Sequence, residues 1–125
     1  MNPSVYLASG SPRRKELLTQ LGVRFDVLPV AVDEEPLPGE GAADLVCRLA
    51  SAKALAGVVV RRDPGAPVVA ADTSVALGAE LFAKPLDQAD AARILSRLSG
   101  RTHAVFTAVA VADGQRERVE LSRSE

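Results

Sequence analysis

The fold is decided by the stretch LASGSPRRKELL, residues 7–18, in which a short apolar run passes through a turn of small residues into a helix. Ser11 suits the N-cap of this helix, and Pro12 suits its first turn, where a missing N–H costs nothing. Three cationic residues, Arg13 to Lys15, follow directly, although the start of a helix dipole favours negative charge. The stretch therefore predicts a strand, a tight turn and a helix with an unusual concentration of positive charge at its start.

This positive charge has two interpretations. The basic side chains can simply extend into water. Alternatively, Arg13 and Arg14, the hydroxyls of Ser9 and Ser11 and the free N–H groups of the first helical turn together bind a multiply charged anion. The second interpretation explains why the cations stand against the local dipole, so we expect an anion site here.

The rest of the chain alternates between strand and helix patterns. Such alternation is typical of an α/β fold, and we expect a mixed, largely parallel sheet flanked by helices. The spacing of Leu17, Leu18 and Leu21 predicts that all three face the core from the first helix. Strands are expected at 5–8, 25–30, 68–71, 73–77, 80–82, 103–112 and 118–121, with 73–77 and 80–82 forming a hairpin; helices are expected at 12–21, 42–57 and 87–98, and a loop at 33–41.

Composition limits the class of protein. With 125 residues, 47% of them hydrophobic, residues 1–125 are expected to form a single domain with one core. A net charge of −1, one Tyr, three Phe and no Trp argue against a nucleic-acid partner. The single cysteine, Cys47, excludes an internal disulfide framework, and no apolar run approaches the ~20 residues that span a bilayer. We therefore expect a cytoplasmic protein with no membrane partner.

Two acidic segments are candidates for metal or water binding. Asp72 follows the apolar run 68–71, so we expect it at the carboxyl end of a strand, where ligands of α/β sheets gather. The alternative is that Asp72 starts a turn through Thr73. Asp33 and Glu34 begin an acidic run that is usually only a solvated loop, but it offers the hard oxygen ligands that Mg²⁺ prefers.

Two lysines have sequence settings that can present a positive charge. Lys53 lies on the apolar stripe of the 42–57 helix, so its ammonium group either reaches water past Leu49 or meets an anion, and it can also pair with Glu34. Lys84 precedes Pro85, which restrains it to an extended backbone. His103 and Cys47 have no partner that would indicate catalysis, and we expect structural roles for both.

The opening motif L-A-S-x-S-P-R-R-x-E-L-L resembles that of the Maf family of nucleoside triphosphate pyrophosphatases. The resemblance continues in the family's order through the segments Asp33-Glu34, Ala52-Lys53-Ala54, Ala71-Asp72-Thr73, Lys84-Pro85 and LSGRTH at 98–103. It implies a Maf/ITPase-like fold and hydrolysis between the α- and β-phosphates. Family members continue beyond the matched region, so the resemblance also implies that the C-terminal part of the sheet is missing here.

The resemblance further implies roles for individual residues. Glu34 and Asp72 would hold a divalent cation, Mg²⁺ with Mn²⁺ as the alternative, and activate water, and Lys53 and Lys84 would complete the catalytic group. The substrate-binding group implied is Ser9, Ser11, Arg13, Arg14 and Thr73. Arg13 and Thr73 stand where the branch acting on dTTP and UTP has them. The alternative is a truncated, non-catalytic nucleotide-binding or division-regulating protein, and a homodimer is compatible with either.

Overall fold

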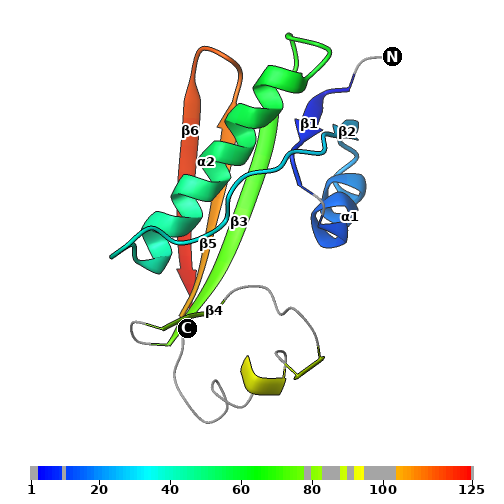
Figure 1. Ribbon diagram of the computed structural model, residues 1–125. Coiled ribbons are helices and arrows are strands. Elements are labelled where there is room, and N and C mark those ends of the chain that lie inside the picture. Colours follow the sequence, from blue (N-terminus) through cyan, green and yellow to red (C-terminus); the bar gives the residue numbers. More distant parts are fainter. Residues whose placement is uncertain are drawn as a thin grey trace.

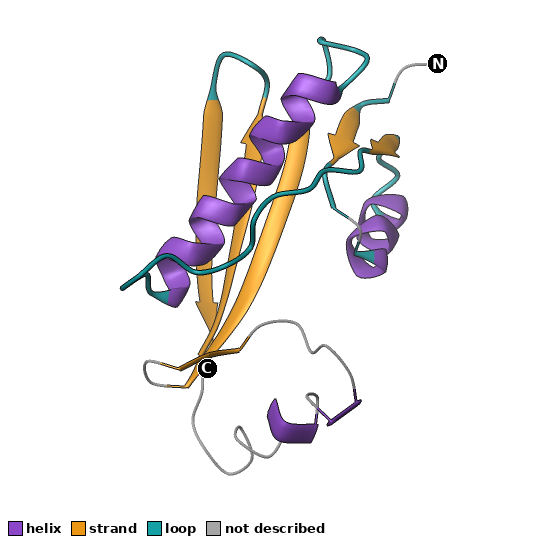
Figure 2. Ribbon diagram, in the orientation of Figure 1, coloured by secondary structure: helices purple, strands orange, loops and turns teal. Residues whose placement is uncertain are grey.

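The computed structural model describes residues 3–9, 11–77, 80–82, 88–89, 92–94 and 104–124. These residues form an α/β fold (Figures 1 and 2), as the sequence predicts. The helix expected at 87–98 lies mostly outside the described residues, and within it 88–89 and 92–94 are helical. The elements are β1 (Val5–Leu7), α1 (Pro12–Gln20), β2 (Phe25–Val27), α2 (Ala42–Val60), β3 (Val68–Leu77), β4 (Glu80–Phe82), β5 (Ala104–Ala112) and β6 (Glu117–Ser124).

The described strands form one mixed sheet of order β2-β1-β3-β5-β6, with β4 paired to β3. β1 runs parallel to β2 and β3, whereas the pairs β3–β4, β3–β5 and β5–β6 are antiparallel. The expectation of a largely parallel sheet is therefore wrong, although the mixed sheet is confirmed. The reason is that a short turn at 113–116 joins β5 to β6, and such a connection can only reverse the chain.

The two long helices of the described chain lie on opposite faces of the sheet. α2 runs diagonally across β3, β5 and β6 (Figure 1). The chain moves from β1 to β2 through α1 and back across β1 to β3 through α2. Because both crossovers are right-handed by rule, these opposite movements place α1 on the other face.

Small residues bring α2 close to the sheet. Gly57 shows how close, since a Cβ atom added there would lie 2.6 Å from Cγ1 of Val68. The buried core cluster is Tyr6, Ala8, Leu28, Val46, Ala50, Ala54, Ala66, Val68, Ala70, Ala108, Ala110 and Ala112.

The prediction that Leu17, Leu18 and Leu21 face the core is wrong for two of them. Leu17 in α1 is 55% exposed and Leu21, the C-cap of α1, is 67% exposed, and α1 has no buried residue. A helical period identifies residues that share a face, but it does not show whether anything packs on that face. Here α1 lies beside two strands of only three residues each, which are too short to cover it. On the sheet face away from α2, Val109 and Val111 are each 40% exposed.

None of the helices in the described part of the chain has the length and apolar character needed to cross a membrane.

Candidate functional site

The candidate site lies where β1 ends beside β3. Leu7, the last residue of β1, pairs with Val69, while β3 continues to Leu77. Asp72 and Thr73 therefore lie inside β3, paired with residues of β5, and the expected strand end at 71 and the alternative turn at Thr73 are both wrong. The strand that ends at this level is β1, whose carboxyl end leads into the cationic helix α1.

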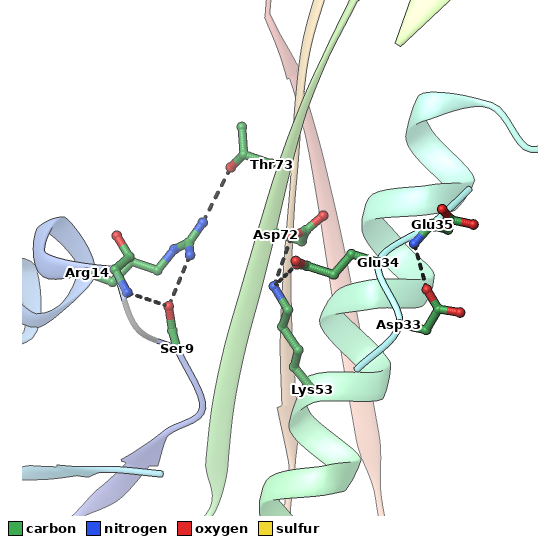
Figure 3. Close-up of polar contacts among 9 residues, drawn as sticks. Ser9, Arg14, Asp33, Glu34, Glu35, Lys53, Asp72 and Thr73 are labelled. Carbon is green, nitrogen blue, oxygen red and sulfur yellow. Dashed lines mark hydrogen bonds and ion pairs between the residues drawn. The ribbon is translucent and has the colours of Figure 1, made fainter. Parts of the chain in front are cut away.

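On the α2 side of β3, Lys53 joins two carboxylates. Its Nζ lies 3.1 Å from Oδ1 of Asp72 and 3.1 Å from Oε1 of Glu34 (Figure 3). The lysine and aspartate side chains are only 17% and 14% exposed, whereas Glu34 is 62% exposed. The pairing of Lys53 with Glu34 is confirmed, and the alternative in which the ammonium reaches water past Leu49 is wrong.

The loop that carries Glu34 is fastened to α2 by Arg48. Nε and Nη2 of Arg48 donate to the two carboxylate oxygens of Glu40 at 2.7 and 2.9 Å, and Nη2 also donates to the carbonyl of Glu35 at 3.1 Å. The Arg48 guanidinium and the Leu37 amide lower the pKa of Glu40 to about 2. Sequence analysis missed this pair because residues eight apart across a loop–helix boundary have no characteristic spacing.

On the other face of β3, Arg14 joins the start of α1 to the sheet. Its Nη1 donates to Oγ of Ser9 at 3.1 Å, and its Nη2 approaches Oγ1 of Thr73 at 3.5 Å (Figure 3). The Ser11 amide also donates to Oγ of Ser9, at 3.2 Å. Arg13 is exposed, and no hydrogen bond or ion pair joins it to another described residue. Of the two arginines, it is Arg14 that the structure connects to the other predicted residues.

Ser11 occupies the N-cap position of α1, as predicted, but its side chain makes no capping hydrogen bond. The first-turn N–H groups of α1 thus lack the side-chain acceptor that a capping serine usually supplies. An exogenous anion can accept from them, which is consistent with the predicted anion site.

Charge is distributed unequally over the two faces of β3. Asp72 and Thr73 are consecutive, and consecutive strand residues point to opposite faces. On the α2 face, two carboxylates surround one ammonium group and leave an excess of negative charge. On the α1 face, Arg13 and Arg14 have no carboxylate partner among the described residues. The first face favours a cation and the second an anion.

The divalent cation that the family resemblance implies prefers hard oxygen ligands. Glu34 and Asp72 supply hard oxygen ligands, but within the described ranges no three Asp, Glu, His or Cys side chains form a metal-binding group. Mg²⁺ usually binds through one or two carboxylates together with waters and substrate phosphates. The pair therefore fits a cation that is shared with a phosphate ligand, and does not form a complete protein cage.

Lys84, His103 and the segment at 98–103 lie outside the described residues, so their predicted roles stay predictions.

Comparisons with known proteins agree with the motifs. The family model described as Maf-like protein matches residues 4–125. The chain is 57% identical over 118 residues to a dTTP/UTP pyrophosphatase of Myxococcus xanthus, covering 94% of the chain and 59% of that relative. It is 52% identical over 112 residues to a dTTP/UTP pyrophosphatase of Escherichia coli K12, covering 90% of the chain and 56% of that relative. The chain thus spans about three fifths of the length of these relatives.

The fold has a counterpart among solved structures. The crystal structure of protein VC0702 from Vibrio cholerae matches 98% of this chain and 62% of its own length with a TM-score of 0.52. The sequence identity is 16%, so this likeness concerns the fold alone.

Proposed function

The chain belongs to the Maf-like protein family, and from this premise we propose that it binds a nucleoside triphosphate, dTTP or UTP, and hydrolyses it to the monophosphate and pyrophosphate. Curated relatives that are 50–57% identical carry the name dTTP/UTP pyrophosphatase. The choice of pyrimidine nucleotide rests on these names and on the motif residues.

The observation that carries the proposal is that two consecutive residues of β3 belong to groups of opposite charge. Asp72 belongs to the acidic group with Glu34 and Lys53, and Thr73 belongs to the cationic group with Arg14. A nucleoside triphosphate carrying a divalent cation presents both charges within one ligand. Phosphoryl transfer needs cations at the phosphates and a positioned water more than it needs a covalent nucleophile.

In this proposal, Arg14 and the N–H groups of α1 donate hydrogen bonds to the phosphates. Oγ of Ser9 already accepts two hydrogen bonds, so its own proton remains available for a phosphate oxygen. Lys53 leaves the carboxylates and donates to the phosphate chain. Asp72 accepts the proton of the attacking water, whose oxygen forms a new bond to phosphorus as the α–β bridge breaks. Mg²⁺ or Mn²⁺ held by Glu34 and Asp72 would supply Lewis-acid stabilisation of the phosphate charge.

The test is a nucleotide panel assayed for pyrophosphate release with Mg²⁺. We expect release from dTTP and UTP that is lost in Asp72→Asn and kept in Asp26→Asn, a matched change at an exposed strand residue. Release of orthophosphate in place of pyrophosphate would contradict cleavage at the α–β bridge. Nucleotide binding without turnover in the unchanged chain would instead support the non-catalytic alternative. The homodimer, the cytoplasmic location and the absence of a nucleic-acid partner stay predictions.

A further inference from the structure

Thr107 on β5 contacts the cationic group but was not among the residues selected from the sequence. It lies directly across from Thr73 in the β3–β5 register, and the two Oγ1 atoms are 3.2 Å apart. We propose that Thr107 is a positioning residue of the proposed pyrophosphatase site and fixes the Arg14 guanidinium through the hydroxyl of Thr73. The inference rests on the proposed function, since it assigns the task that Arg14 performs.

The direction of the hydrogen bonds follows from the donors available. A guanidinium group only donates, so Oγ1 of Thr73 must accept from Arg14. A hydroxyl offers one proton and two lone pairs, which leaves Thr73 free either to donate to Thr107 or to accept a second bond from it. In both cases the contact with Arg14 is preserved, and the three side chains form one continuous chain of hydrogen bonds.

The rotamer of Thr73 is the property that Thr107 controls. A β-branched side chain has few allowed χ1 values, and these exchange the positions of its hydroxyl and its methyl group. The bond to Thr107 favours the rotamer that keeps Oγ1, and not the methyl carbon, available to Arg14. Of the two side-chain hydrogen bonds that Arg14 makes with described residues, the one to Thr73 is the longer, at 3.5 Å, and it exists only while Oγ1 faces Arg14.

The experiment compares Thr107→Val, which keeps the shape but removes the hydroxyl, with Thr107→Ser, which keeps the hydroxyl. Val109→Thr is the control, a change on the same face of the same strand. We expect Thr107→Val to raise both the KM for dTTP and the Kd for inorganic pyrophosphate about 3- to 10-fold, as for one lost hydrogen bond. We expect kcat to change less than about twofold. Thr107→Ser and Val109→Thr should leave both constants within about twofold of the unchanged protein.

A double-mutant cycle separates positioning from a general structural effect. If Thr107 acts through Thr73, then Thr107→Val should have no further effect on the pyrophosphate Kd in a Thr73→Val background. Additive effects, a fall in kcat alone, an unchanged Kd in Thr107→Val or a failure of Thr107→Ser to restore affinity would each overturn the proposal.

The pyrophosphate Kd also separates this proposal from the proposed function. A chain that binds pyrophosphate but releases none from nucleotides contradicts the enzymatic function, while the cycle still decides the role of Thr107. A chain that binds neither nucleotide nor pyrophosphate overturns both.

Discussion

Replacement of Lys53 by methionine removes the single positive charge that holds two carboxylates together. Because Nζ lies 3.1 Å from an oxygen of Glu34 and 3.1 Å from an oxygen of Asp72, these oxygens are at most about 6.2 Å apart. Two unit charges at that separation repel by about 3 kcal/mol at an effective dielectric constant of about 20. The 62% exposure of Glu34 reduces this to about 1 kcal/mol through solvent screening. The variant should fold, and its unneutralised carboxylates of Glu34 and Asp72 should attract a cation strongly.

The same geometry makes Lys53 a competitor of any divalent cation in the nucleotide-free protein. An ammonium group about 4 Å from a divalent ion opposes it by about 2 kcal/mol even with the dielectric constant of water. We therefore expect Lys53→Met to bind Mn²⁺ about 10- to 30-fold more tightly than the unchanged protein, measured by electron paramagnetic resonance or calorimetry without nucleotide. Pyrophosphate release should fall about 100-fold in the same variant, because a phosphate contact is lost.

Two further variants make this prediction refutable. Arg62→Met removes one positive charge nine residues further along, roughly a Debye length or more from Lys53, and should leave Mn²⁺ affinity nearly unchanged. Asp72→Asn added to Lys53→Met should abolish the gain. Equal Mn²⁺ affinity in Lys53→Met and the unchanged protein, or an equal gain in Arg62→Met, would refute the reasoning.

Three other predictions follow from packing and charge. The pKa of Glu40 is lowered from 4.5 to about 2. The bond between Glu40 and Arg48 should therefore stabilise the fold fully above pH 4.5, and this stabilisation should be lost as the pH falls through about 2. A carboxyl NMR titration of Glu40 with a midpoint near 4.5 would contradict this. Leu49→Ala, at a residue 3% exposed, should lower the free energy of unfolding by about 2–5 kcal/mol, and Leu21→Ala, at the 67% exposed C-cap of α1, by under about 1 kcal/mol. Similar losses in chemical denaturation would show that Leu21 is packed after all. Gly57→Ala should destabilise the protein by about 1 kcal/mol, because the cost of overpacking against Val68 exceeds the gain in helix propensity. This cost should disappear in a Val68→Ala background. A Gly57→Ala variant that is more stable than the unchanged protein would refute the reasoning.

The sequence predicted most elements because their signals are local. Ser11 and Pro12 marked the start of α1, and the apolar stripe of the 42–57 helix, which includes Leu49, marked the buried face of α2. Strands were predicted at 68–71 and 73–77, but their continuity through Asp72 as one strand was missed, because a charged residue interrupts the apolar run. The structure accommodates Asp72 and Thr73 through partners from other segments, since Asp72 meets Lys53 and Thr73 meets Arg14 and Thr107. The antiparallel direction of most strand pairs was also missed, because the direction of pairing depends on two segments together and not on either one alone.

In the candidate site, too, the residues within motifs could be predicted from the sequence, and those that depend on three-dimensional contacts could not. The motifs identified Lys53, Asp72 and Glu34, and the structure brings these three into contact. The motif could not distinguish Arg13 from Arg14, since only the turn of the helix decides which guanidinium reaches the sheet. Arg48 and Glu40 gave no signal because residues eight apart across a loop–helix boundary have no characteristic spacing, and Thr107 gave none because its partner, Thr73, is 34 residues away.

The length of β1 explains how one ligand can reach both faces of β3. β1 stops beside Val69 and β4 begins to pair at Val75, so between these points no described strand covers that edge of β3. Asp72 and Thr73 lie within this uncovered edge and point to opposite faces. A longer β1 would pair with these residues and separate the acidic group from the cationic one. A ligand that contacts both groups would therefore cross the sheet at this edge. In the proposed function, this gap in strand pairing lets one strand, whose side chains alternate between two faces, contact both the polyphosphate and its cation.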